Sequence, residues 1–409
     1  MGAGSEKRNA EENVPGADRP DPLASFASFH GGRKLRAGFT TRTCAAAASK
    51  AAMLMMLSGE ELPEVRVLLP AGPVLCLTPL DISIEKNVRA SCSIRKDAGD
   101  DPDATDGILI RADVEAEQLF PGEGTSEIRI LGGEGIGRVT KPGLDQPVGE
   151  AAINSVPRKM ILEGAENALR SCGVHGRVRV TISADRGREI AEKTFNPRLG
   201  IVGGISILGT EGVVRPMSER ALVETIRADI RVHAQGGGPL IAVPGNYGVR
   251  FLAETFGLPE ELPVLMSNFI GETIDAAADS GASRLVLAGH IGKFVKLAGG
   301  IMNTHSREAD ARMEILAAHA LRCGADRETC LEILDAAVTQ EAVTILKKKG
   351  LLAPVSRSLS AAMERAAAHR AAGRIRTSVL FYTLEDGVLA AGEDAGQWIL
   401  EAAHRAAGK

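Results

Sequence analysis

Three short loops combine glycines with polar side chains, and each follows an apolar run that is typical of a strand. Their sequences are "PGNYG" at 244–248, "SNFIGE" at 267–272 and "GHIGKFVK" at 289–296. Glycine lets a ligand approach the backbone closely, and the polar side chains supply directional contacts. His290 is a candidate for proton transfer, and Lys293 and Lys296 can receive carboxylates. Each feature also has a simpler interpretation. The glycines of a single loop can just form a tight turn, His290 can be a structural residue, and the two lysines can lie on a solvent-exposed helix face.

The loops match no known phosphate-binding fingerprint. The chain has no GxxxxGK[ST] motif, and "GGEGIG" at 132–137 has the wrong spacing for GxGxxG. A P-loop kinase or an ordinary dehydrogenase is therefore weakly supported. The spacing reveals no Ser-His-Asp or Cys-His arrangement and no cluster of His and carboxylates for a metal. The six cysteines include no CxxC pair, so we expect reduced thiols and no protein-bound metal.

The three loops belong to successive strand–loop–helix units that follow about residue 217. The strands "PLIAV", "PVLMS" and "RLVLA" are short and apolar throughout, which indicates parallel pairing with both faces of the sheet covered. Right-handed crossovers then place the loops at one edge, outside the carboxyl ends of the strands, where ligands bind in open α/β sheets. We therefore expect Asn246, Asn268 and His290 to line a common rim.

The first half of the chain has a different pattern of predicted helices and strands. A helix is predicted over about 40–57 and another over about 157–172, and alternating runs such as "LDISIE", "VRASCSIR" and "RVRVTISA" indicate a half-buried, largely antiparallel sheet. From about residue 307 the chain is mostly helical. The predicted division is a disordered tail (1–33), an α+β domain (34–216), an α/β domain with parallel strands (217–385) and a C-terminal helix (386–409).

Composition argues against several classes of function. The net charge is −4 and aromatic residues make up 3% of the chain, whereas a nucleic-acid binder usually presents basic patches and stacking platforms. No apolar run approaches the ~18 residues that suggest a membrane span. The N-terminus lacks the apolar region of a signal peptide. We therefore expect a cytoplasmic protein that contacts neither nucleic acid nor membrane.

Arg42 is unusual in the helix entrance "GFTTRTCAAAAS" at 38–49. The start of a helix is already electropositive, so a guanidinium is poorly placed there unless something negative lies opposite. Thr40, Thr41 and Thr43 add hydroxyls to the free N–H groups of the first turn. A bound carboxylate is one interpretation. A solvent-facing arginine that tolerates its site is the other.

Several long stretches together resemble the CbiD family, the cobalt-precorrin-5B C-1-methyltransferases of anaerobic cobalamin biosynthesis. They include "LRAGFTTRTCAAAAS", "GGEGIGRVTKPGL", "PVGEAAINSVPRKMI", "NPRLGIVGGISILGTEGVVRPMS", "PGNYG", "SNFIGE" and "GHIGKFVKLAGGIMNTHS". These segments appear in the family's order over roughly residues 35–382. The family generally has glycine where this chain has Arg42, and prolines where it has Ala151 and Ser155, so the resemblance assigns no shared catalytic role to Arg42.

The resemblance implies transfer of a methyl group from S-adenosylmethionine to ring carbon C-1 of cobalt-precorrin-5B, giving cobalt-precorrin-6A. Cobalt then arrives with the substrate and is not held by the protein. The implied fold is an S5-domain-2-like α+β domain followed by a Rossmann-like α/β domain. The substrate can supply the nucleophilic carbon itself, so the protein contributes mainly positioning and water exclusion. A base that removes a substrate proton would be His290 first and Glu272 second.

The resemblance also assigns ligands to the motifs. The residues expected to bind S-adenosylmethionine are Gly245, Asn246, Tyr247, Gly248, Ser267, Asn268, Gly271, Gly289 and Gly292. Those expected to bind the corrinoid are Thr40, Thr41, Arg42, Thr43, Lys141, Arg198, Lys293, Lys296 and His305. A homo-oligomer and transient contact with neighbouring pathway enzymes are left open. Two rival functions also stay open at this point: a small-molecule kinase, and a corrinoid carrier without chemistry of its own.

Overall fold

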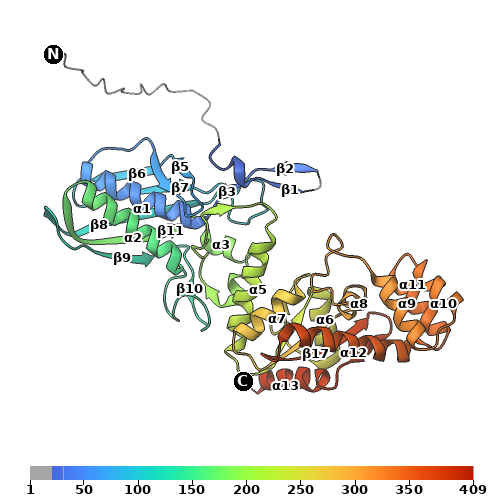
Figure 1. The fold of residues 1–409 in the computed structure, drawn as a ribbon. Coiled ribbons are helices and arrows are strands. Elements are labelled where there is room, and N and C mark those ends of the chain that lie inside the picture. Colours follow the sequence, from blue (N-terminus) through green and yellow to red (C-terminus); the bar gives the residue numbers. More distant parts are fainter. Residues whose placement is uncertain (1–20, 31, 409) are drawn as a thin grey trace, which may run out of the picture. The chain divides into compact units, whose positions relative to one another are not determined.

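In the computed structural model, which describes residues 21–30 and 32–408, the chain forms two compact units (Figure 1). Unit 1 runs to Leu131 and adds Val156–Asp185 and Ile207–Met217, and the rest belongs to unit 2. The predicted boundary near residue 216 is therefore incomplete, because residues 132–155 and 186–206 belong to unit 2. These two segments pair with each other, Arg138 lying opposite Val202 in an antiparallel bridge.

Unit 1 is built on a five-stranded sheet in the order β6-β7-β8-β11-β9. Its strands are β6 (Leu80–Glu85), β7 (Arg89–Arg95), β8 (Leu109–Pro121), β9 (Glu127–Gly132) and β11 (Val174–Ala184). The β6–β7, β7–β8 and β8–β11 pairs are antiparallel, which confirms the prediction from alternation. Helix α1 (Thr41–Ser58) packs against β7 and β8.

The two long helices of unit 1 begin and end close to where the sequence predicts. In α1 the Thr40 hydroxyl accepts from the Thr43 amide, and Gly59 ends the helix in the left-handed conformation (φ 80°) that favours glycine. Helix α2 spans Ser155–Ser171. The smaller elements of this unit are η1 (Ala24–Phe26), β1 (Ser28–His30), β2 (Arg33–Leu35), β3 (Gly38–Phe39), β4 (Val65–Leu68), β5 (Val74–Leu77) and β13 (Val213–Val214).

The predicted disordered tail needs a correction. Residues 1–20 lie outside the described residues. Within the remainder, η1 is followed by a hairpin in which Ser28 pairs with Leu35 and His30 with Arg33. The Ser28 hydroxyl also donates to the Pro216 carbonyl at 3.0 Å. This part of the chain is therefore tied to unit 1 by hydrogen bonds that its polar composition does not reveal.

Unit 2 is built on a second five-stranded sheet, in the order β15-β14-β16-β17-β18. Its strands are β14 (Leu240–Val243), β15 (Val264–Leu265), β16 (Arg284–His290), β17 (Arg376–Thr383) and β18 (Gly387–Ala391). Strands β14–β17 are parallel and only β18 runs antiparallel to its neighbour. Helices α6 (Asn246–Phe256) and α13 (Ala395–Ala407) cover one face. The predicted C-terminal helix is thus preceded by a strand.

The other face of this sheet carries most of the remaining helices. They are α5 (Glu219–Ala234), α7 (Ile270–Asp279), α8 (Ile291–Ala298), α9 (Arg312–Arg322), α10 (Arg327–Leu334), α11 (Thr339–Lys348) and α12 (Leu352–Ala371). The strands alternate between the two cores, Leu285 and Leu287 facing one and Val286 and Ala288 the other. Unit 2 also holds β10 (Arg138–Val139), α3 (Gly187–Ala191), α4 (Asn196–Leu199) and β12 (Ile201–Val202).

Candidate active site

The strand order of unit 2 places the three glycine-containing loops at one edge. Val243 pairs with Leu265 and Ala242 with Leu287, all in parallel, so β14, β15 and β16 end on the same side of the sheet. The prediction that the loops share an edge is therefore confirmed. The chain passes from β14 to β15 on one side and then to β16 on the other, so the order reverses between β14 and β16. Ligands of open α/β sheets bind at such a switch point.

The loop after β14 leaves open space at this switch point. Gly245 lies directly before α6, and a Cβ built there meets no heavy atom within 4 Å. Tyr247, in the first turn of α6, is 73% exposed. The first N–H groups of a helix have no partner inside it, so this turn can bind polar ligand atoms. Gly248 has a different role, because a Cβ there would lie 2.8 Å from the Cβ of Val243.

His290 ends β16 and caps α8. Its Nδ1 accepts from the Gly292 amide at 3.1 Å. A neutral ring that accepts at Nδ1 carries its proton on Nε2, and burial lowers the pKa of His290, which favours the neutral ring. The geometry therefore suits donation from Nε2, whereas the predicted role of a base requires a ring nitrogen with a free lone pair.

Tyr382 lies beside His290, and sequence reasoning missed it. The two residues are paired across β16 and β17, with ring centroids 5.9 Å apart and planes at 86°. Tyr382 also stacks on Phe251 of α6, with centroids 3.7 Å apart. Burial raises the pKa of Tyr382 to about 12, so its hydroxyl stays protonated at neutral pH. Both tyrosines of the chain, Tyr247 and Tyr382, therefore lie at this edge. Because the chain has only two, each could have been considered as a candidate site residue from the sequence.

Asn268, from the loop after β15, connects this edge to a cavity. Its Oδ1 accepts from Lys293 Nζ at 2.8 Å and from the Thr304 hydroxyl at 3.4 Å, and its carbonyl accepts from the Thr304 amide. The cavity, of about 320 Å³, is called the basic pocket below, and it is lined by Asn268, Gly292, Lys293, Lys296, Thr304, His305, Ser306 and Arg312. The structure thus brings together three of the predicted corrinoid contacts: Lys293, Lys296 and His305.

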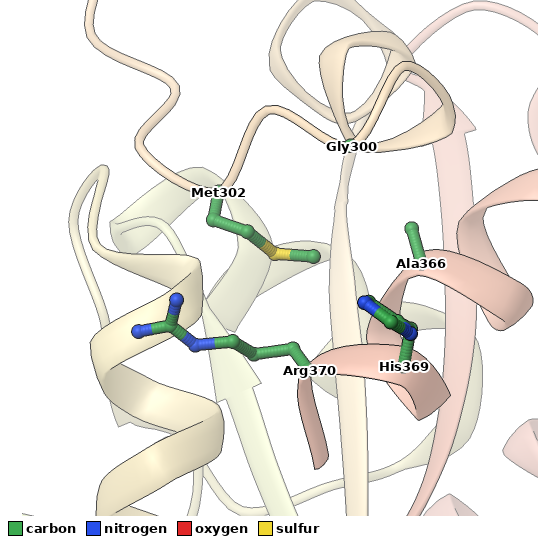
Figure 2. Close-up of a pocket in the computed structure, with 5 residues that line it drawn as sticks. All are labelled: Gly300, Met302, Ala366, His369 and Arg370. Atoms are coloured by element: carbon green, nitrogen blue, oxygen red, sulfur yellow. The ribbon is translucent and has the colours of Figure 1, made fainter. Parts of the chain in front are cut away.

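A second cavity, of about 340 Å³, shares no lining residue with the basic pocket (Figure 2). Met302 and His369 line it, together with Arg370, which is held by Asp275 of α7. Gly271, a predicted cofactor contact, faces this region, because a Cβ there would lie 2.9 Å from the Cβ of Met302. The absence of a side chain at Gly271 therefore allows the loop after α8 to pack closely against this position.

The remaining predictions at this edge have mixed outcomes. Glu272, the second candidate base, forms an ion pair with Arg227 of α5 at 2.8 Å and does not line the basic pocket. Gly289 is required by packing, since a Cβ would lie 2.1 Å from the Phe294 ring. Ser267 adopts a positive φ of 52°, which bends the chain between β15 and α7. None of these three positions presents a group to the basic pocket.

Arg42 does not face solvent, which the second interpretation of this residue required. Its side chain is fully buried (0% exposed), and Nη1 donates to the Thr210 carbonyl at 2.9 Å. Nε and Nη2 have no hydrogen-bond partner among the described residues, and burial lowers the pKa of the guanidinium. Thr41 and Thr43 donate to the Leu208 and Gly212 carbonyls. The predicted corrinoid contact of Thr40–Thr43 is therefore unsupported, because these side chains are buried under residues 208–212.

We expect Arg42→Ala to lower the free energy of unfolding by about 2–4 kcal/mol, because it leaves a cavity and removes the bond to Thr210. Arg42→Met keeps the buried stem and removes a charge with two unsatisfied nitrogens, so it should stay within about 1 kcal/mol of the original chain. Urea denaturation of both variants checks this. An alanine variant as stable as the original chain would contradict the packing role.

Lys141 and Arg198 lie together in unit 2, but Arg198 is already paired. Its Nε lies 3.0 Å from Asp229 Oδ2, and both side chains are largely buried. Asp229 also faces His233 Nδ1 at 3.1 Å. Burial opposes ionisation of His233, but the Asp229 carboxylate outweighs it and raises the pKa of the imidazole. Lys141 is exposed and donates to the Arg198 carbonyl at 3.3 Å. This arrangement ties α4 to α5 and leaves Arg198 little capacity for a ligand.

Two features are absent from the described part of the chain. Among the helices of residues 21–30 and 32–408, none combines the length and apolar character that a bilayer span requires. In the same part of the chain, no group of three or more His, Cys, Asp or Glu side chains is arranged to hold a metal ion.

Comparison with known proteins gives consistent matches. The family model described as CbiD matches residues 28–216, and the one described as CbiD, C-terminal domain, matches 303–393. A Ruminiclostridium cellulolyticum protein named cobalt-precorrin-5B C(1)-methyltransferase is 49% identical, covering 86% of this chain and 90% of its own. A protein of the same name from Alkaliphilus metalliredigens is 42% identical, covering 90% and 94%. The crystal structure of the cobalamin biosynthesis protein CbiD from Archaeoglobus fulgidus shows 29% identity, covering 71% of this chain and 89% of its own, with a TM-score of 0.37.

Proposed function

This chain belongs to the CbiD family, and on that premise we propose where its methyl transfer takes place. It is a cobalt-precorrin-5B C(1)-methyltransferase of cobalamin biosynthesis, like the relatives that it matches over most of their length. The reaction methylates ring carbon C-1 of cobalt-precorrin-5B and gives cobalt-precorrin-6A. The carrier and kinase alternatives are not favoured. A cytoplasmic location and the S5-like and Rossmann-like descriptions of the two units remain part of the proposal.

The methyl donor is S-adenosylmethionine, bound at the switch point between β14 and β16. The open space at Gly245 is the observation that carries this assignment, because it lies where the strand order reverses and no side chain fills it. The donor fits there as a polar nucleoside beside the first turn of α6. When bound, it supplies a methyl group on a positively charged sulfur.

The residues around the switch point orient the two reactants. The exposed ring of Tyr247 offers a flat apolar surface beside Gly245, suited to a base or ribose. His290 offers an Nε2–H donor, and the ring of Tyr382 lies against the imidazole in a T-shaped contact. A fixed orientation of the nucleophilic carbon in line with the transferred methyl group accounts for a large part of catalysis in such transfers. The substrate supplies that carbon, so the chain needs no nucleophile of its own.

Incubation of the full chain with cobalt-precorrin-5B and isotopically labelled S-adenosylmethionine, under anaerobic conditions, tests the activity. We expect mass analysis of the pigment to show the mass of one labelled methyl group, because the donor's methyl is transferred intact. S-Adenosylhomocysteine should also raise the melting temperature, whereas ATP should not. An unlabelled pigment would reject the enzymatic function and favour a carrier, which responds to the corrinoid alone.

A further inference from the structure

Within the part of the chain that the structure describes, the basic pocket is lined by three cationic side chains and by no carboxylate. Lys293, Lys296 and Arg312 all line it. Arg312 is neutralised by Asp310, whose two oxygens accept from its Nε and Nη2 at 2.7 and 2.8 Å. Among the described residues, neither lysine has a carboxylate within salt-bridge distance. A cavity of about 320 Å³ therefore faces two ammonium groups without counter-charges.

Lys296 is the more unusual of the two. Its residue is only 3% exposed, and its Nζ donates to the Thr304 carbonyl at 3.2 Å and the Ala309 carbonyl at 2.7 Å. An ammonium has three N–H groups, so these carbonyls use two of them. Carbonyl oxygens satisfy hydrogen bonds but do not offset the cost of removing a full charge from water. The hydrogen bond from Arg312 is the main reason that the pKa of Asp310 is lowered, and the charge of Lys296 contributes less. Asp310 is therefore engaged by Arg312 and not by Lys296.

Lys293 adds a second charge one helical turn earlier. Its Nζ donates to the neutral amide oxygen of Asn268 at 2.8 Å. Burial and the nearby charge of Lys296 both lower the pKa of Lys293, as expected for two cations that lack an anion. His305 contributes a donor at Nε2, because its Nδ1 accepts from the Arg307 amide at 3.1 Å.

We infer that the basic pocket binds peripheral carboxylates of the corrinoid, with Lys296 as the buried anchor and Lys293 and His305 as flanking donors. This inference rests on the proposed function, because the acetate and propionate side chains of the substrate supply the anions. Two neighbouring carboxylates would balance the two lysines without a change in protonation. The same chemistry would accept inorganic phosphate or the carboxylate of the methyl donor, so the experiment distinguishes these sources.

The test compares two corrins that share the same ring and differ in whether their peripheral carboxyl groups are free or methyl-esterified. The full chain is titrated calorimetrically with dicyanocobyrinic acid, which carries free carboxylates, and with its fully methyl-esterified form, which has none. Inorganic phosphate and S-adenosylhomocysteine are titrated separately. We expect the acid to bind and the ester to bind at least ~10-fold more weakly, because hydrogen bonds to charged groups are lost.

Three variants assign the effect to the pocket. Lys296→Met should weaken binding of the acid by about 10- to 100-fold, and Lys293→Met by about 10-fold, with no effect on S-adenosylhomocysteine. Lys349→Met, at an exposed lysine outside the pocket lining, is the matched control and should change nothing. If Lys296 only held the loop at 304–309, its variant would alter the melting temperature while Lys293→Met would leave the affinity unchanged.

Several results would overturn the inference. They are failure of the acid to bind the original chain, equal affinity for acid and ester, unchanged affinity in both pocket variants, and competition by phosphate at equal concentration. A loss of S-adenosylhomocysteine binding in the variants would assign the pocket to the methyl donor instead. Because donor binding and methyl transfer are measured separately, the proposed function can stand when this inference fails.

Discussion

Gly245→Val is expected to abolish S-adenosylmethionine binding and methyl transfer while leaving the chain folded. The backbone at Gly245 is extended (φ 177°), a conformation that any residue adopts, and the space for a side chain is open. Valine therefore costs little in the free chain. Its methyl groups would occupy the volume proposed for the donor, so we expect the dissociation constant of S-adenosylhomocysteine to rise at least ~100-fold, or about 2.7 kcal/mol.

Calorimetric titration of S-adenosylhomocysteine into both chains measures this effect. Gly396→Val is the matched control, because a Cβ at Gly396 in α13 also meets no atom within 4 Å. That variant should bind the ligand normally. Unchanged binding by Gly245→Val, with an unchanged melting temperature, would show that the donor lies elsewhere.

His290→Asn is expected to lower kcat by about 100-fold, the scale of a lost catalytic or orienting proton donor. Asparagine can still accept from the Gly292 amide and cap α8, so the fold should be kept. It cannot reproduce the Nε2–H group. His290→Ala, which also removes the cap, should in addition lower the stability by about 1 kcal/mol.

The pH dependence supplies an independent readout of His290. Burial lowers its pKa below the ordinary value of 6.5. The neutral, Nε2-protonated ring therefore persists across neutral pH. We expect kcat to fall only when the pH drops below 6.5, because a proton on Nδ1 breaks the contact with the Gly292 amide that fixes the orientation of the ring. An asparagine variant with full activity would remove His290 from the mechanism. An activity that rises with pH through 7 and above would instead indicate a group that must lose a proton, which the Nδ1 contact argues against.

The arrangement of the three loops could be predicted because it follows from a local pattern. Runs such as "PLIAV" and "RLVLA" are apolar on both faces, which indicates buried parallel strands. Right-handed crossovers then fix the edge at which the loops lie. The structure has these strands parallel, and Asn268 accepts a hydrogen bond from Lys293 of α8, the helix that follows β16.

Other features depend on contacts between distant residues and could not be predicted. Arg42 is buried because residues 208–212 cover it, about 170 positions later, and no local pattern reports that cover. Tyr382 reaches His290 only through the pairing of β16 with β17. The chain also crosses between the two units several times, so a single boundary in the sequence could not describe them.

The role of each glycine also could not be predicted from the sequence. A sequence alone does not distinguish a glycine that makes room for a ligand from one that makes room for its own fold. A Cβ at Gly248 or Gly289 would meet Val243 or Phe294, whereas one at Gly245 would meet nothing. Only the last is therefore suited to the approach of a ligand. A role in binding the cofactor stays a prediction for all of these glycines, and the open space supports it at Gly245.

A crystal structure of the full chain with S-adenosylhomocysteine bound is the most direct test of the location proposed for the methyl donor. We expect the nucleoside to lie between the first turn of α6 and His290, in contact with Gly245 and with its sulfur directed toward the basic pocket. A ligand bound with no atom near Gly245 or His290, whether in unit 1 or on another surface of unit 2, would contradict it.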